Sequence, residues 1–455
     1  MGVLEFPPRP VCATGWLLSP ADDLELAAPD TGADRLTLDD RANDEFVAAN
    51  LKRNYIANFA HGMLGMTGFR LVFAPTFVPT YLYLLTGSSL MVGVGQSLQQ
   101  LGAVLSPLLG ASAIEDKKRI LPYANRTGLM MRVQLLGLAL SGWFLDGIWL
   151  AGVTILFLFL LGYFMGAQRV AFQMLMAKVI PLAKRGRLQG YRNFAGGAVA
   201  AGLSWWAGDY LIDNNILGNG YATTFMLSFI LTSLGLTVLV MFIREPDSHQ
   251  RRPTMNLRDR LRELPQLLKD RNYKYFLIAQ LLTTSGRIGM PFCILHVGEV
   301  TVLDGKALGL LSLAFLGADT LSNVVWGTLG DKRGFRIVFL LSLTLWIASF
   351  VLMLVARDQL GFLIAFATMG AAICGYMMSS QTMILEFGNR NDVPMRLALS
   401  TTAETSVATI SPLIGGVIAT FAGFMPLISL SIALMSAALA IIVLYVREPR
   451  DFDLL

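Results

Sequence analysis

The sequence predicts an all-α integral membrane protein whose twelve transmembrane helices form two pseudo-symmetric six-helix bundles. Of its 455 residues, 54% are hydrophobic and only 15% are charged, whereas a soluble domain carries about 25% charged residues. Apolar stretches of about twenty residues, the length that crosses a bilayer as a helix, recur along the chain. We expect spans at 55–84, 90–112, 127–146, 149–176, 192–212, 222–243, 274–297, 308–329, 336–356, 361–384, 397–421 and 424–446.

Internal repetition divides these spans into six and six. Four short matches occur in the same order in both halves. They are Arg-Asn-Tyr at 53–55 and 271–273, an arginine followed by a proline (Arg70 with Pro75, Arg287 with Pro291), Leu-Gly-Ala at 101–103 and 316–318, and Arg-Glu-Pro at 244–246 and 447–449. We therefore expect bundles at 53–245 and 272–450, a cytoplasmic linker at 246–271 with an amphipathic helix near 257–268, and a short tail at 451–455.

Residues 1–52 form a tail that is rich in acidic residues and contains several prolines. Such a segment cannot bury enough apolar surface to fold by itself, so we expect most of it to be disordered. The pattern tightens at 37–52, which predicts a short cytoplasmic helix leading into the first span. The start of the chain lacks the basic and apolar segments of a cleaved signal peptide.

The loop between the eighth and ninth spans carries the most specific motif. It reads Gly-Thr-Leu-Gly-Asp-Lys-Arg-Gly-Phe-Arg from 327 to 336. We expect the preceding helix to end between Gly327 and Gly330, because glycine allows the backbone to turn tightly. The motif residues are Gly327, Asp331, Lys332, Gly334 and Arg336.

This loop resembles the signature of the major facilitator superfamily, the twelve-helix secondary transporters. The resemblance extends over nearly all of 53–450 and implies alternating access, in which one bundle rocks against the other around a midplane site and the motif gates the movement. The corresponding loop of the first half, 110–119, keeps its charges but loses the glycine and aspartate spacing. In the eleventh span, Pro412 to Gly416 resembles an element of drug/proton antiporters, or is a kink with small residues for close packing.

Basic residues indicate the orientation of the chain. If the N-terminus is cytoplasmic, the cytoplasmic loops hold most loop lysines and arginines, among them Lys117, Lys184 and Lys332, and the external turns keep Lys306 and Arg357. Cytoplasmic loops of membrane proteins show this excess. We therefore expect both termini in the cytoplasm and, from the resemblance, a multi-pass protein of a bacterial-type inner membrane.

Five ionisable residues fall inside the expected spans. A charge at such depth is costly unless it is paired or solvated, so these side chains should face the interior of the bundle. They could pair with one another and merely lock helices together. Alternatively, three arginines outnumber two acids, which leaves a net positive cavity suited to an anionic solute. The five are Arg70, Arg169, Arg287, Asp319 and Glu404.

Two further roles follow from residue type. Asp319 and Glu404 are candidates for proton coupling, because the pKa of a carboxyl in a low-dielectric cavity responds to water access and to a nearby arginine. Gln96 and Gln100 lie one helical turn apart on one face of the second span, so both can bind a solute. Hydrogen bonds between helices are the alternative reading.

Several functional classes have no support in the sequence. It shows no catalytic constellation, no phosphate-binding loop and no pair of histidines at metal-ligand spacing. The three cysteines are far apart, and the basic residues fit membrane-facing loops rather than a nucleic-acid surface. We therefore expect no enzyme, no cofactor, no metal and no nucleic-acid partner, and a monomer in the lipid bilayer.

The sequence thus predicts a secondary active transporter of a small solute, an organic anion, with possible symport of protons. Two alternatives stay open. One is a transporter-like membrane assembly or sensing factor that moves no solute, which the acidic tail and the altered loop at 110–119 would suit. The other is a lipid or lysolipid flippase. Substrate, direction and coupling ion are not encoded in any motif.

Overall fold

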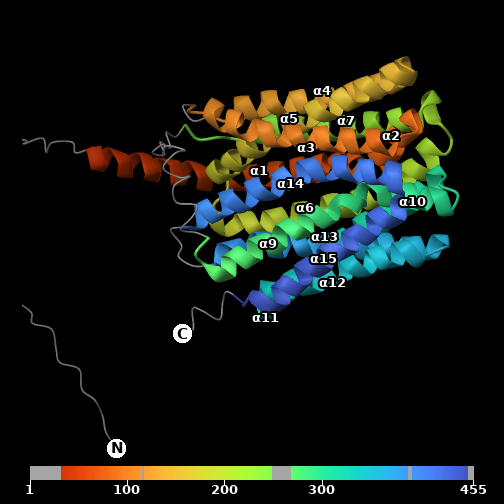
Figure 1. The fold of residues 1–455 in the computed structure, drawn as a ribbon. Coiled ribbons are helices and arrows are strands. Elements are labelled where there is room, and N and C mark those ends of the chain that lie inside the picture. Colours follow the sequence, from red (N-terminus) through yellow and green to blue (C-terminus); the bar gives the residue numbers. More distant parts are fainter. Residues whose placement is uncertain (1–31, 115–116, 248–267, 388–391, 449–455) are drawn as a thin grey trace, which may run out of the picture.

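The computed structural model describes residues 32–114, 117–247, 268–387 and 392–448, and every regular element within these ranges is a helix. Figure 1 shows long helices lying side by side, with the start of α1 (Gly32–Phe73) and the end of α15 (Phe424–Tyr445) at the same end of the molecule. We call that end the terminal face and the other end the opposite face. In this view most helices of the first half lie in the upper part and most of the second half in the lower part, with α14 (Val393–Ala422) and α6 (Leu182–Trp206) between them (Figure 1).

A helix lies at each of the twelve predicted spans, which confirms the predicted all-α architecture. The first bundle contains α1 with α2 (Phe77–Thr86), α3 (Ser89–Ile114), α4 (Leu121–Phe144), α5 (Gly147–Val179), α6 (Leu182–Trp206) with the π-helix η1 (Ala207–Ile212), the short η2 (Ile216–Gly218) and α7 (Gly220–Phe242). The second contains α9 (Arg271–Gly286), η3 (Arg287–Gly289), α10 (Met290–Val300), α11 (Gly305–Arg333), α12 (Phe335–Val355), α13 (Gln359–Glu386), α14 (Val393–Ala422) and α15 (Phe424–Tyr445).

Eight of the described helices are long and apolar enough to cross a membrane by length and composition alone. Two local features reduce the signal elsewhere. Helix α6 begins with a basic segment that includes Lys184, Arg185 and Arg187. The seventh span is divided into α9, with 16 residues, and α10, with 11, and neither piece spans a bilayer by itself.

The first and seventh spans are broken where the sequence analysis expected continuous helices. Helix α1 ends at Phe73 and α2 begins at Phe77, with Pro75 between them. The 3-10 turn η3 separates α9 from α10, and Pro291 opens α10. Proline lacks a backbone N–H and its ring collides with the preceding turn, so an α-helix cannot pass through it unchanged. The two breaks occupy equivalent positions of the internal repeat.

The N-terminal helix is longer than the expected segment 37–52. Helix α1 begins at Gly32 and continues without a break into the first span. The rest of the predicted acidic tail, the predicted linker helix near 257–268 and the C-terminal tail at 451–455 lie outside or almost wholly outside the described residues.

The Arg-Asn-Tyr and Arg-Glu-Pro repeats meet each other in the structure. In the first bundle, the Asn54 side chain donates to the Arg244 carbonyl at 3.0 Å and accepts from the Arg244 amide at 2.8 Å. In the second bundle, Asn272 makes the same two bonds with Arg447, at 3.2 and 2.8 Å. Each asparagine therefore joins the start of the first span of its bundle to the segment just after the last helix.

The glutamates of the two Arg-Glu-Pro segments also act alike. Glu245 accepts hydrogen bonds from the amides of Ile120 and Leu121, at 2.7 and 2.8 Å, where α4 begins. Glu448 accepts from the Arg336 amide at 3.1 Å, where α12 begins. The first amides of a helix have no partner within it and carry a partial positive charge. Both glutamates therefore cap the helix that forms the third span of their bundle, α4 or α12.

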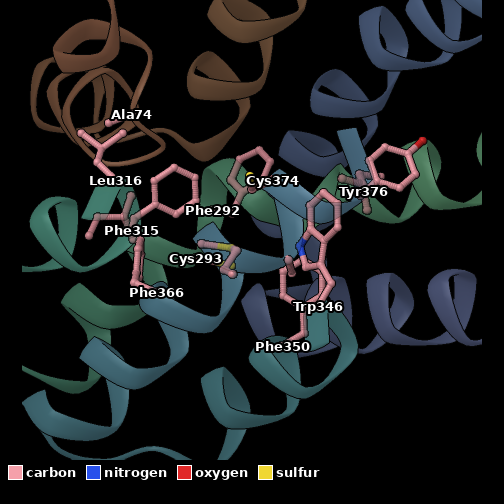
Figure 2. Packing of buried hydrophobic residues seen from close by; sticks show 14 of the residues in the cluster. Ala74, Phe292, Cys293, Phe315, Leu316, Trp346, Phe350, Phe366, Cys374 and Tyr376 are labelled. Carbon is pink, nitrogen blue, oxygen red and sulfur yellow. The ribbon is translucent and has the colours of Figure 1, made fainter. Parts of the chain in front are cut away.

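The apolar core continues from one bundle into the other. Figure 2 shows Phe292, Phe366 and Trp346 packed within the second bundle, and Ala74, from the break in the first span, beside Leu316 of α11. The bundles pack along two helix pairs, α3 with α14 and α6 with α11. The broken helices therefore lie against the shared core.

Candidate functional site

A central cavity of about 280 Å³ lies between the bundles, at the two helix breaks. Pro75 and Pro291 both line it. Discontinuous helices are a common way to build transporter sites, because the broken backbone presents polar groups to a ligand near the midplane. The polar lining consists of Gln96, Gln99, Gln100, Arg169, Thr284, Arg287 and Ser411. Four of the predicted site residues, Gln96, Gln100, Arg169 and Arg287, therefore lie in one cavity.

Arg70 does not line this cavity and is joined to the other bundle instead. Its Nη1 donates to Asp319 Oδ2 at 2.5 Å and to Thr320 Oγ1 at 3.3 Å. The Arg70 and Asp319 side chains are 21% and 19% exposed. This ion pair links α1 to α11, so the first predicted arginine meets the first predicted acid across the interface between bundles.

The second predicted acid, Glu404, lies in a hydrogen-bond network within the second bundle. Its carboxylate accepts from Gln280 Nε2 at 3.0 Å, Tyr376 Oη at 3.2 Å and Thr284 Oγ1 at 3.3 Å. The nearest guanidinium nitrogen of Arg287 is 4.0 Å away. Arg287 therefore has an acidic neighbour, as Arg70 does, which agrees with the expectation that intramembrane charges pair with one another.

Arg169 differs from the other two arginines. It is exposed within the fold, lines the central cavity and forms no ion pair or hydrogen bond with another described residue. Gln99, which the sequence analysis did not select, is 5% exposed, and its Nε2 has no hydrogen-bond partner in the described structure. An unsatisfied buried amide is costly, so it suits a group that a ligand completes.

A larger cavity of about 760 Å³ lies in the first bundle and touches the central one at Met165 and Arg169. Arg132 of α4 and Arg192 of α6 line it, and both are buried, at 1% and 5% exposure. Sequence reasoning missed both. Arg132 lies inside an expected span and could have been found by the criterion that selected Arg70. Arg192 is the first residue of the expected span and so looked like a residue at the membrane surface, but α6 begins ten residues earlier, at Leu182.

The motif loop ends its helix later than predicted. Helix α11 passes through Gly327 and Gly330 and ends at Arg333, so the expected end at 327–330 is wrong. The turn falls at Gly334, whose φ of 84° favours glycine. Gly330 is needed for packing, since a Cβ there would meet the Phe335 ring.

Beyond the turn, the motif contacts the last helix of its bundle. Arg336 Nη2 donates to the carbonyls of Ile442 and Val443, both at 3.2 Å. Asp331 and Lys332 are exposed at the terminal face. The loop therefore connects α11 and α12 to the end of α15.

The bundles meet most closely toward the opposite face. A Cβ at Gly416 of α14 would lie 3.2 Å from the Gly93 Cα of α3, and one at Gly208 of η1 would lie 2.5 Å from the Gly309 Cα of α11. Four hydrogen bonds join the bundles at the level of Arg70 and toward that face. They are Arg70 with Asp319 and Thr320, Thr76 with Ser312, and Asp213 with Gly305.

Within the described ranges, no group of three or more His, Cys, Asp or Glu side chains is arranged to hold a metal ion. The polar groups around the central cavity are amides, hydroxyls and guanidinium groups, with one carboxylate behind Arg287. Such groups bind and orient a solute.

Comparison with known proteins agrees with this architecture. Residues 276–453 match the family described as Major Facilitator Superfamily. Over 164 residues the chain is 30% identical to the "Multidrug resistance protein MdtG" of Yersinia enterocolitica, and 29% identical to the protein of that name from Serratia proteamaculans. Each match covers 35% of this chain and 39% of the relative, so the chain spans about two fifths of the curated relatives' length.

Solved structures resemble almost the whole fold. A mutant of the nucleoside transporter NupG superposes with a TM-score of 0.68 at 11% identity, over 85% of this chain and 99% of that one. The D-xylose-proton symporter gives 0.67 at 13% identity, over 88% and 99%. At such identities the likeness concerns the fold.

Fold and sequence thus define one class, multi-pass membrane proteins built from two pseudo-symmetric six-helix bundles. Residues 276–453 match the major facilitator superfamily, and the fold of most of the chain resembles that of the solved transporters. This superfamily is one of transporters rather than of enzymes.

Proposed function

We propose that the protein is a secondary transporter of a small organic anion, working by alternating access in a bacterial inner membrane. The observation that carries the proposal is the central cavity itself, which both bundles line at their broken helices. In this reading the terminal face and both termini are cytoplasmic. Close packing near Gly93 and Gly208 closes the opposite face, so the described state faces inward.

The polar groups of the cavity support an anionic substrate. Arg169 has no acidic partner among the described residues, and guanidinium groups bind carboxylates and phosphates with paired hydrogen bonds. Gln99 supplies an unused amide donor, and Gln96 and Gln100 lie beside it. A volume of about 280 Å³ suits a small metabolite, because sites for drug-sized ligands occupy about 300–1,000 Å³.

Proton coupling is proposed for the two carboxylates. Asp319 bridges the bundles through Arg70, and Glu404 lies behind Arg287. If rocking separates α1 from α11, Asp319 loses its cation and gains access to water, which favours a change in its protonation. Asp319→Asn should then abolish uphill accumulation and keep counterflow exchange, which needs no net proton movement. Accumulation with wild-type pH dependence would exclude Asp319, and Glu404→Gln would then be tested alone and in combination.

Uptake into proteoliposomes tests the substrate class. Carboxylates, phosphate esters, neutral sugars and nucleosides, and lipophilic cations would be supplied in turn to the wild-type protein. For the best substrate, Arg169→Gln and Gln99→Ala should each lower kcat/KM about tenfold or more, since a hydrogen bond to a charged group contributes about 1.5–3 kcal/mol.

Gln134→Ala is the matched control. Gln134 is also a buried glutamine of the first bundle, but it lines neither cavity. Its replacement should leave uptake unchanged. If the best substrate is neutral or cationic and Arg169→Gln has no effect on its uptake, the proposal of an anionic substrate is wrong, whereas the proposal of a transport function stands. No transport of any solute would favour a sensing or assembly role.

Export of lipophilic compounds is the second candidate, favoured by the similarity to proteins named for multidrug resistance. Energised efflux of a lipophilic cation from vesicles, insensitive to Arg169→Gln, would support it over the organic anion.

A further inference from the structure

The larger cavity, within the first bundle, is lined by positive charge without a compensating carboxylate. It has a volume of about 760 Å³ and extends from Arg169 to the start of α6 on the terminal face, where Arg185 and Gln189 line it. Arg132 and Arg192 form its inner wall. No aspartate or glutamate belongs to the described lining, whereas Arg70 and Arg287 each meet one.

The two buried arginines are held by neutral groups only. Arg132 donates to the carbonyls of Thr232 and Gly128, both at 2.7 Å. Arg192 donates to Gln189 Oε1 at 3.2 Å, and its Cζ lies 4.8 Å from the centre of the Phe172 ring. Its Nε is buried and has no hydrogen-bond partner in the described structure. A buried cation within a membrane is costly without a counter-charge, so a bound anion would stabilise Arg132 and Arg192.

A neighbouring amide adds a donor of fixed direction. Gln168 Oε1 accepts a hydrogen bond from Thr127 Oγ1 at 2.5 Å, which leaves the amide NH₂ of Gln168 as a donor in the cavity lining. The polar part of the cavity therefore offers mainly donors and positive charge. Phe69 and Met131 cover another part with apolar surface.

We propose that this cavity is a second anion site, separate from the central one and reached from the terminal face, which binds a phosphate group carried on an organic molecule. Planar guanidinium groups bind phosphate oxygens through paired hydrogen bonds. The apolar wall accommodates the organic part, and the volume exceeds what a lone phosphate ion needs. Arg169 lines both cavities, so an anion in one changes the electrostatic potential in the other.

Two sources of this phosphate chemistry exist, a soluble phosphate ester and the headgroup of an anionic lipid. Titration calorimetry on the full-length protein in neutral detergent tests the soluble source, with inorganic phosphate and phenyl phosphate as probes. Phenyl phosphate should bind more tightly than inorganic phosphate, and salt should weaken both.

Variants locate the binding. Arg192→Gln should weaken phenyl phosphate binding about tenfold or more. Arg192→Lys should weaken it less, because lysine keeps the positive charge but lacks the paired N–H donors of the guanidinium group. Arg187→Gln is the control, since it removes the same charge from the same helix outside the cavity lining. If Arg192→Gln fails to fold, Arg169→Gln replaces it with the same expected loss. Wild-type affinity in the folded variant would overturn the proposal.

Nanodiscs test the lipid source. With phosphatidic acid in the disc, a bound headgroup should weaken phenyl phosphate binding several-fold compared with purely zwitterionic lipid, and Arg192→Gln should remove that difference. If neither phosphate probe nor phosphatidic acid binds, the site does not exist. Gln99→Ala separates this proposal from the transport function, because it should lower uptake through the central cavity and leave phenyl phosphate binding unchanged.

Discussion

The two bundles hold their intramembrane charges in different ways. In the first, Arg132 and Arg192 are surrounded by carbonyls, an amide and aromatic rings. In the second, Arg287 lies beside Glu404, whose carboxylate also accepts three hydrogen bonds. The internal repeat therefore preserves the scaffold but not the charge balance. An arginine that is paired with an acid stabilises its bundle. An arginine without an acidic partner leaves a positive electrostatic potential, which favours the binding of an anionic ligand.

Arginine removal should give the largest contrast. Arg70→Gln leaves Asp319 without its cation at the bundle interface, and loss of one member of a buried pair costs about 3 kcal/mol or more. Because both side chains are about one fifth exposed, the lower end is expected. Arg192→Met, by contrast, removes an unpaired buried charge and should leave the thermal midpoint equal or higher in anion-free buffer. Thermal unfolding in detergent compares them.

A rescue variant separates charge from packing. Arg70→Gln combined with Asp319→Asn should recover most of the stability lost in Arg70→Gln, since no buried charge is then unpaired. If the double variant is as unstable as the single one, the guanidinium of Arg70 contributes through packing, and the contrast between paired and unpaired arginines is lost.

Larger side chains at the opposite face should shift the equilibrium between the closed and the open opposite face. Gly416→Leu and Gly208→Leu place side chains where the bundles are in close contact, so they should disfavour the closed opposite face by tenfold or more. Labelling of a single cysteine in the central cavity, with a reagent added from that side, measures the change. Gly202→Leu is the control, because open space surrounds Gly202. Equal labelling of all variants would show that closure does not depend on these contacts.

The two capping glutamates should differ in a smaller way. Glu245 is 2% exposed, accepts two helix amides and lies 3.3 Å from Lys178. Glu448 is only partly buried. Glu245→Gln should therefore lower stability by about 1–2 kcal/mol, and Glu448→Gln by less than 1 kcal/mol. Urea-dependent unfolding of the two variants measures the difference; equal losses would show that burial does not set the strength of these caps.

The smallest effect is expected for Arg119 and Asp247 at the terminal face. They form two hydrogen bonds, at 2.5 and 2.9 Å, but their side chains are 61% and 56% exposed. The bond from Arg119 lowers the pKa of the Asp247 carboxyl. Its stabilising effect is therefore present at neutral pH and is lost as the pH falls through that lowered pKa. Arg119→Gln should leave the thermal midpoint unchanged within error, because water and salt screen exposed pairs.

Much of the scaffold could be predicted because its signals are local. Apolar length predicted all twelve spans, and the Arg-Asn-Tyr repeat placed Asn54 and Asn272 at equivalent positions, where the structure shows matching contacts. The end of α11 was misjudged, because a glycine within a helix can serve close packing, as Gly330 does, instead of ending it. The breaks in the first and seventh spans were missed although Pro75 and Pro291 marked them.

The predicted site was only partly complete, because depth in a span does not reveal a partner. Arg70 and Asp319 are 249 positions apart in the sequence, and only the packing of α1 against α11 joins them. The sequence analysis selected Gln96 and Gln100 because they share a helix face, yet the neighbouring Gln99 is the residue whose buried amide lacks a partner in the described structure.

The sequence by itself determined the number and order of the spans and the equivalence of the two halves, since hydrophobicity and repeated motifs are properties of neighbouring residues. Only the tertiary structure decided which charges are neutralised. That depends on how α1, α4, α5 and α6 pack around one cavity and how α9, α13 and α14 pack around Glu404. Electrostatic energy falls with distance between side chains in space, and distance along the chain does not fix it.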